Sequence, residues 1–178
     1  MKIISLLALL CCAATSGCGY TTNSLLPPEL SSIHVKNFAN KIDPGKEISD
    51  KRASYSYRSG LEIDITKAVI DKFVFDKNLE IKSEDKSALV LKGELIDFRK
   101  YTLSYDSDDN VEEYRVEIIV NLEMYNNLTG KIMWTEKSFM GEDTYTLTGP
   151  NTKTESTAIQ EAVEDLAQRI EERIIEAW

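Results

Sequence analysis

The fold is decided by one stretch, EEYRVEIIVNLEMYNNLTGKIMWTEKSFM, which occupies residues 112–140. Over residues 112–125 polar and apolar side chains alternate, with the apolar set at Tyr114, Val116, Ile118, Val120, Leu122 and Met124 and only Ile119 out of phase. Strand side chains point to alternate faces of a sheet, so this pattern predicts an antiparallel strand with one buried face. Residues 126–130, NNLTG, predict a hairpin loop, and residues 131–140 the return strand.

Two more strands are predicted on the N-terminal side of this hairpin. Over residues 88–105, Leu89, Leu91, Leu95 and Leu103 share one parity, while Val90, Ile96 and Phe98 make the other face partly apolar. Ile33 and Val35 alternate with polar residues and predict a strand near residues 31–38. The polar residues 40–58, with the turn sequence DPG at 43–45, predict a loop.

Helical spacing of apolar residues predicts two amphipathic helices. The first covers residues 59–77, with Ser59 as its cap, Glu62 three residues later, and Asn78 at its end. The second runs from Thr152, which with Glu155 forms a capping-box candidate, to Trp178. The element order is β-α-β-β-β-α, which predicts an α+β two-layer sandwich: two helices packed on a four-stranded, mostly antiparallel sheet.

The N-terminus is predicted to be a lipoprotein signal peptide covering residues 1–17. Lys2 precedes an apolar run at residues 3–12 that is too short to span a bilayer. Small uncharged residues then lead to Gly17 and Cys18, between which we expect cleavage, as in the bacterial lipobox, although Thr15 stands where that motif usually has Leu. Residues 18–30 are expected to form a lipidated tether, and residues 31–178 a single domain.

The distribution of cysteines agrees with lipidation of Cys18. The chain has three cysteines, at 11, 12 and 18, and the first two leave with the signal peptide. A lone thiol is a liability in an oxidising compartment, and acylation with diacylglycerol consumes it. The alternative is an ordinary cleaved signal followed by an unmodified cysteine. Gly19 follows the lipid site. In the usual Gram-negative sorting rule, Asp at that position retains a lipoprotein in the inner membrane, so by resemblance to that rule Gly19 predicts the outer membrane.

Composition restricts the possible partners. The 178 residues are 42% hydrophobic and 29% charged, as in ordinary globular proteins, and carry a formal net charge of −9. An acidic chain is a poor candidate for nucleic-acid binding or for docking onto anionic lipid by charge alone. We therefore expect no nucleic-acid partner and a membrane attachment that depends on the acyl chains.

No catalytic site is predicted. The single histidine, His34, lies in the first predicted strand without a second metal-ligating or triad residue beside it. Asp106, Asp108, Asn110 and Glu117 occupy positions 1, 3, 5 and 12 of a calcium-loop pattern. Val111, however, stands where that loop needs glycine, and strands flank it, so an acidic hairpin tip is the favoured interpretation. We expect no enzyme activity, no metal and no cofactor apart from the covalent lipid on Cys18.

Several segments in order resemble one known family. They are GCGY at 17–20, IHVKNF at 33–38, ALVLKG at 88–93, EYRV at 113–116, GKIMW at 130–134 and IIEAW at 174–178. Together they resemble the lipopolysaccharide-assembly lipoproteins of the LptE family. The resemblance implies two helices on a four-stranded sheet. It also implies an outer-membrane lipoprotein on the periplasmic face that assembles with and plugs the LptD β-barrel and binds lipopolysaccharide during its delivery to the outer leaflet.

The resemblance also places candidate lipopolysaccharide contacts near strand tips in the second half of the sheet. The matching positions are Lys131 and Lys137, with Arg99 and Lys100 behind them. Cations there have a physical purpose, because lipid A carries phosphates. These lysines can equally be solvated strand-edge residues that block edge pairing. The alternative function is a periplasm-facing lipoprotein that tethers or activates a cell-wall synthesis enzyme without contacting lipopolysaccharide.

Overall fold

The structure is a computed structural model, and it describes residues 27–43, 53–54, 59–150 and 152–176. The predicted signal peptide, the cleavage site at Gly17 and Cys18, and most of the predicted tether lie outside the described residues. These assignments stay predictions. The described chain begins with a short 3-10 helix, η1 (Pro28–Leu30), whose Leu30 is already buried in the core although the prediction places it in the tether.

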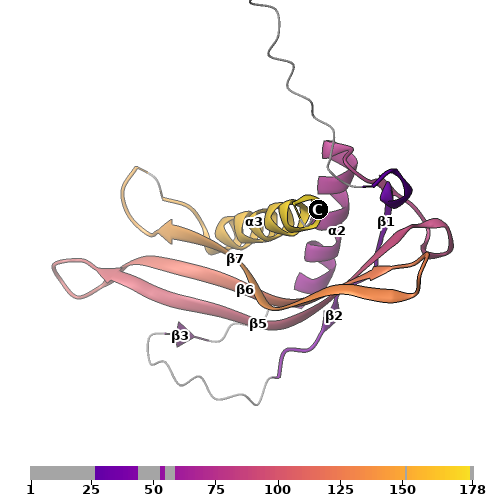
Figure 1. The fold of residues 1–178 in the computed structure, drawn as a ribbon. Helices are drawn as coiled ribbons and strands as arrows, with labels where there is room; N and C mark the ends of the chain where they lie inside the picture. Colours follow the sequence, from indigo (N-terminus) through magenta and orange to yellow (C-terminus); the bar gives the residue numbers. More distant parts are fainter. Residues whose placement is uncertain (1–26, 44–52, 55–58, 151, 177–178) are drawn as a thin grey trace, which may run out of the picture.

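Three long strands form an antiparallel meander at the centre of the molecule (Figure 1). They are β5 (Leu89–Tyr105), β6 (Val111–Asn126) and β7 (Lys131–Thr146). The apolar set of β6 from Val116 to Met124 is buried beneath the helices, as its alternation predicts, and Tyr114 packs partly buried against the same core. The return strand β7 is confirmed as well, and it continues six residues beyond the predicted end at residue 140.

The rest of the sheet differs from the prediction. Strand β1 (Ser32–Val35) lies between β5 and the two-residue β4 (Glu80–Ile81), and it runs parallel to both. The short strands β2 (Ala39–Asn40) and β3 (Ala53–Ser54) pair with β5 as well. The described residues therefore form a seven-stranded mixed sheet with the order β4-β1-β5-β6-β7, and the prediction of four mostly antiparallel strands was wrong. Two-residue strands show no periodicity in a sequence, which is why they escaped prediction.

The two predicted helices are present, but their caps differ from those predicted. Helix α2 (Leu61–Asp76) follows Gly60, whose φ of 89° is left-handed, and no side chain caps its first turn, so the prediction of Ser59 was wrong. It ends at Lys77, which is left-handed as well, rather than at Asn78. Helix α3 (Glu155–Ile175) is capped by Thr154, whose hydroxyl accepts a hydrogen bond from the Thr157 backbone N–H. The predicted cap, Thr152, instead donates to the carbonyl of Gly149.

Both helices cover one face of the sheet and leave the other face of β5–β7 without a helix, as Figure 1 shows. We call this second face the outer face. The core between helices and sheet is formed by buried residues of every layer, among them Ile33, Leu61, Phe73, Leu91, Phe98, Ile118, Leu166 and Ile170. No helix in the described ranges is both long and apolar enough to cross a membrane.

A β-bulge in β5 changes which residues face the helices. The pairing with β6 shifts register between Leu95 and Asp97. Leu95 and Phe98, three residues apart, are therefore both buried in the core, although strict alternation would separate them. Leu103, which shares the parity of Leu89, is 42% exposed and lies outside the core, so the shared parity does not give one buried face along the whole strand.

Candidate functional site

Of the four predicted contact residues, Lys131 lies at one end of the sheet. It is the first residue of β7 and is exposed, directly after the turn that joins β6 to β7. That turn is held by two asparagines. Asn126 Oδ1 accepts hydrogen bonds from the backbone N–H groups of Leu128 and Thr129, and Asn127 Nδ2 donates to the carbonyls of Glu84 and Ser87. The backbone at Lys131 is fixed, while no ion pair to its ammonium group is found within the described residues.

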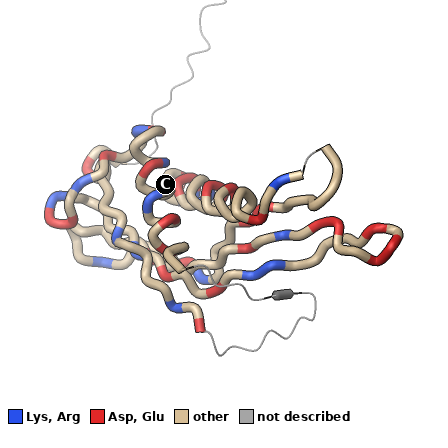
Figure 2. The backbone as a smooth tube through the Cα atoms, turned by 180° about the vertical axis from the view of Figure 1, so that it is seen from behind, with Lys and Arg blue, Asp and Glu red and all other residues tan. Residues whose placement is uncertain are grey.

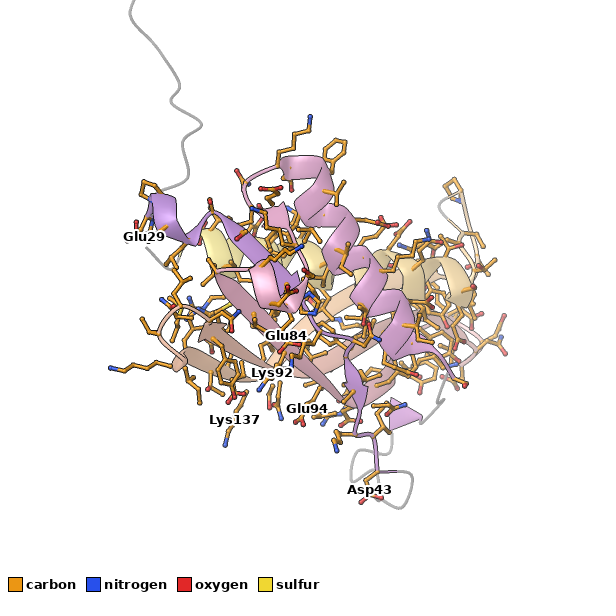
Figure 3. All side chains as sticks on the ribbon, turned by 90° about the vertical axis from the view of Figure 1, so that its right-hand side faces the viewer. Glu29, Asp43, Glu84, Lys92, Glu94 and Lys137 are labelled. Atoms are coloured by element: carbon orange, nitrogen blue, oxygen red, sulfur yellow. The ribbon has the colours of Figure 1, made fainter. Side chains whose placement is uncertain are left out.

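Lys137 is placed by a second β-bulge, this one on the edge strand. Leu122 pairs with Glu136 and Val120 with Phe139, so that Lys137 and Ser138 together oppose Asn121. Ser138 has a φ of 56°, and its N–H donates to Asn121 Oδ1 at 3.1 Å. Lys137 is exposed, and Figure 3 shows it projecting away from the helices together with Lys92 and Glu94. Its ammonium group is accordingly available on the outer face.

Arg99 also lies on the outer face, but its charge is engaged. Its guanidinium contacts Asp97 at 2.6 Å and donates to the Tyr101 hydroxyl at 3.2 Å. All three residues belong to β5 and stand two positions apart, so their side chains lie on the same face of the strand. Asp97 is itself buried and accepts the N–H of Phe98. Arg99 therefore balances a buried carboxylate on its own strand.

Lys100 points to the opposite side, toward the helices. Its ammonium group contacts Glu155, in the first turn of α3, at 2.9 Å and lies over the ring of Tyr114. The Tyr145 hydroxyl donates to the same carboxylate, and burial together with Glu155 raises the pKa of Tyr145. Lys100 thus joins β5 to the start of α3. The four predicted cations do not converge on one site. Of these four, Arg99 and Lys100 have carboxylate partners, whereas Lys131 and Lys137 have no ion pair among the described residues.

The outer face carries a ladder of charges across the three long strands. Arg99 pairs in register with Glu117, which pairs in register with Glu142. Arg115 reaches Glu142 at 3.5 Å. Burial, and then repulsion from Glu142, raises the pKa of Glu117. This part of the outer face is polar but largely self-neutralised.

Lys92 is a cation of the outer face that the sequence did not single out. Its ammonium group lies 3.8 Å from the ring centre of Tyr125 and 3.8 Å from a Glu123 carboxylate oxygen. Lys92 pairs in register with Glu123, which in turn pairs with Thr135. The hairpin loop at residues 126–130 predicts that β6 pairs with β7, but the residue-by-residue alignment of β5, β6 and β7 depends on bulges in both pairings, and no pattern in the sequence marks them.

The calcium-loop pattern is folded as a tight turn. Asp106 Oδ1 accepts the backbone N–H groups of Asp108 and Asn110, both at 2.9 Å. These bonds, first that of Asn110, lower the pKa of Asp106. Glu117, the twelfth position of the pattern, lies well inside β6 and beside Arg115 and Glu142. The described residues contain no group of three or more carboxylate, histidine or cysteine side chains arranged to hold a metal.

Acidic residues dominate two other surfaces. Figure 2 shows them along α3 and at the turn between β5 and β6. A groove of about 710 Å³ lies between α2 and α3, lined by apolar residues such as Ala68, Ile159 and Val163 and by charged residues at its rim. None of the predicted contact residues lines this groove.

Comparison with known proteins identifies the family. The family model LptE, lipopolysaccharide-assembly, matches residues 30–174, which is most of the chain. The chain belongs to the LptE family. Membership confirms the resemblance seen in the sequence and places this LptE-family chain in lipopolysaccharide assembly at the Gram-negative envelope. It further implies an outer-membrane lipoprotein.

Solved structures are similar to this chain at low sequence identity. The hypothetical protein CT253 from Chlamydia trachomatis has a TM-score of 0.50 at 9% identity, covering 81% of this chain and 95% of that one. Rare lipoprotein B from Shewanella oneidensis has a TM-score of 0.47 at 18% identity, again covering 81% and 95%. A minor lipoprotein from Acinetobacter baumannii has a TM-score of 0.47 at 10% identity, covering 83% and 94%. No curated protein is similar enough to count as a relative.

Proposed function

We propose that this LptE-family chain assembles with the LptD β-barrel of the outer membrane and plugs its lumen, with the outer face of β5–β7 against the barrel wall. The observation that carries the proposal is the family match over residues 30–174, together with a broad sheet face that the two helices leave uncovered. The lumen of an outer-membrane barrel is polar. A surface that lies against it should be polar, with its charges balanced.

The charge ladder gives the outer face this character. Arg99 is paired with Asp97, and Arg115 with Glu142, so few unbalanced charges would be desolvated when a polar wall approaches. Fixed, mutually paired charges provide specificity of fit more than raw affinity. The exposed cations Lys131 and Lys137 are different, because they retain charge that a ligand can use.

Lysines 131 and 137 are our proposed lipopolysaccharide contacts. A lysine ammonium binds a phosphate as a point charge, and the phosphates of lipid A supply that charge. Arg99 and Lys100, the other two predicted contacts, already have carboxylate partners. We therefore propose that they act in folding, on opposite faces of β5, and that Lys131 and Lys137 contact lipopolysaccharide.

The anchor completes the proposal. A diacylglycerol-modified Cys18 would hold the domain at the periplasmic face of the outer membrane, because two or three acyl chains give stable attachment where one does not. Mass spectrometry of the mature protein tests this directly. We expect the N-terminal peptide to begin at acylated Cys18, and an unmodified thiol there would remove the anchor from the proposal.

An affinity-tagged chain purified from detergent-solubilised outer membranes tests the barrel partnership. We expect a large barrel protein, LptD, to be recovered in stoichiometric amount. Recovery of a transpeptidase or glycosyltransferase in its place would favour the alternative, a tether or activator of cell-wall synthesis, and would contradict the proposal.

Binding of purified lipopolysaccharide tests the two lysines. The double substitution Lys131→Glu and Lys137→Glu should weaken binding about tenfold or more, because each charge reversal replaces attraction to phosphate by repulsion. Lys67→Glu is the matched control, since Lys67 is an exposed lysine on the helix layer. Equal binding by all three proteins would remove Lys131 and Lys137 from the site.

A further inference from the structure

The bulge in β7 holds one residue more than a regular strand. Glu136 is held on the helix side of the sheet by Arg173 of α3, at 2.8 Å, and Phe139 packs against the core on that same side. Regular alternation places a single residue between two that share a face, but here both Lys137 and Ser138 lie between them. The backbone has to accommodate the extra residue, and more than one conformation can do so.

Ser138 has a conformation that is unusual inside a strand. Its φ of 56° lies in the left-handed region, where glycine is the ordinary residue and a side chain is costly. The other non-glycine residues with positive φ in the described ranges are Lys77, which ends α2, and Asp109, which lies in the β5–β6 turn. Positive φ is common at such places. A strained residue that its surroundings hold in place inside a strand points to a functional role.

Asn121 supplies the contact that holds this strained residue. It lies on β6 directly opposite the bulge, and its Oδ1 accepts the Ser138 N–H at 3.1 Å. The polar residues nearest to it on the outer face of β6, Glu117 and Glu123, are carboxylates, whereas the Asn121 amide is neutral. A carboxylate at this position would offer the same acceptor but would also attract the ammonium group of Lys137. An amide fixes the bulge and leaves the charge of Lys137 for another partner.

We propose that Asn121 is a positioning residue for lipopolysaccharide binding, and that through the Ser138 bulge it directs Lys137 away from the sheet toward a phosphate group (Figure 3). This inference rests on the proposed contact between Lys137 and lipopolysaccharide. A lysine whose backbone is fixed in advance loses less freedom when it binds an anion. Lys131 differs, because the turn at residues 126–130 fixes its backbone without Asn121.

A bulge that carries a lysine can also protect an edge strand from pairing with another chain. Protection needs the charge and the irregular backbone, but it does not need one particular direction of the ammonium group. The two roles therefore differ in what a change at Asn121 does to ligand binding.

Binding of purified lipopolysaccharide to variants of the full chain separates these roles. Lys137→Ala should weaken binding about two- to fivefold, the loss expected for one exposed ion pair. Asn121→Ala should weaken binding by nearly the same factor, and the two substitutions together should weaken it no more than Lys137→Ala alone, because Asn121 acts through Lys137. Asn121→Ala combined with Lys131→Ala is the matched control, in which the two factors should multiply.

A substitution at Ser138 distinguishes positioning from a general loss of structure. Glycine adopts positive φ without strain, so Ser138→Gly in the Asn121→Ala chain should restore the bulge and most of the lost binding. Asn121→Asp, which keeps the acceptor but offers Lys137 a carboxylate, should weaken binding in a way that Ser138→Gly does not restore. Thermal unfolding and gel filtration show whether each variant is folded and monomeric.

Three results would overturn the positioning role while the Lys137 contact stands. They are unchanged binding by Asn121→Ala, losses from Asn121→Ala and Lys137→Ala that multiply, and no rescue by Ser138→Gly in folded protein. Association of the Asn121→Ala chain into dimers with unchanged binding would assign the bulge to edge protection instead. If neither Lys131→Ala nor Lys137→Ala changes binding, the proposed lipopolysaccharide contact is itself wrong, and the role of Asn121 falls with it.

Discussion

Replacing Gly141 by alanine should loosen the docking of α3 on the sheet. Gly141 is buried in β7 opposite Ile118, at the point where α3 crosses the strand. A Cβ atom at Gly141 would lie 2.4 Å from Leu166 Cβ, 2.7 Å from Leu166 Cα and 2.7 Å from the Ala162 carbonyl oxygen. Two of these three atoms are backbone, so no rotation of a side chain can relieve the contact, and the helix itself must move.

The expected loss follows from this geometry. Forcing an extra methyl group into a packed core typically costs about 1–3 kcal/mol. Because α3 must shift as a unit, we expect a loss near the upper end, about 3 kcal/mol in the free energy of unfolding. For a domain of this size, each kcal/mol lowers Tm by about 2–4 °C, which gives a decrease of about 6–12 °C.

Urea and thermal unfolding followed by circular dichroism measure this loss. Thr144→Ala is the control, because Thr144 lies in the same strand, pairs with Arg115 and faces away from the helices. Its substitution should change stability by less than about 1 kcal/mol. If Gly141→Ala unfolds at the same urea concentration as the parent chain, or if both variants shift alike, the close crossing of α3 over β7 is refuted.

Three further substitutions probe individual contacts. Lys100→Ala should lower the free energy of unfolding by about 1 kcal/mol, since it leaves Glu155 with only a hydroxyl partner, and should leave lipopolysaccharide binding unchanged; a binding defect in folded protein would contradict our assignment. Thr154→Ala removes the cap of α3 and should cost about 1 kcal/mol in chemical denaturation, and an unchanged midpoint would argue against the cap. Glu117→Gln should stabilise the chain at neutral pH but not at acid pH. Burial and Glu142 raise the folded-state pKa of Glu117 above its unfolded value, so the parent chain loses stability as pH rises between these two pKa values. Thermal melts at a series of pH values from about 4 to 7 measure this loss. A variant with the same pH profile as the parent would contradict the prediction.

The long strands and helices could be predicted because each presents a periodic apolar face. The alternation of β6 identified its buried residues, from Val116 to Met124, and that pattern depends only on local geometry. The two-residue strands β2, β3 and β4 carry no such signal, and their pairing depends on contacts distant in sequence. The mixed character of the sheet comes mainly from β1, a predicted strand that runs parallel to β5, and alternation of side chains does not reveal the direction in which two strands pair.

The four candidate contacts stay predictions, and the structure does not bring them together as one group. That Arg99 and Lys100 face opposite sides follows from alternation alone, and the pairing of Arg99 with Asp97, two residues away, could have been inferred. The contact between Lys100 and Glu155 could not, since 55 residues separate them. The bulge that exposes Lys137 depends on a positive φ at Ser138. Serine rarely adopts that conformation, so the sequence does not predict the bulge.

Site-specific photocrosslinking in living cells tests the central claim, that the outer face lies against the LptD barrel. A photoreactive amino acid replaces Thr135 or Lys137 on that face, and Gln168 on the surface of α3 provides a comparison position. We predict that irradiation links both outer-face positions to LptD in one covalent adduct of barrel size. Absence of an LptD adduct from both positions in stably folded protein, or adducts with a cell-wall enzyme in its place, would contradict the account.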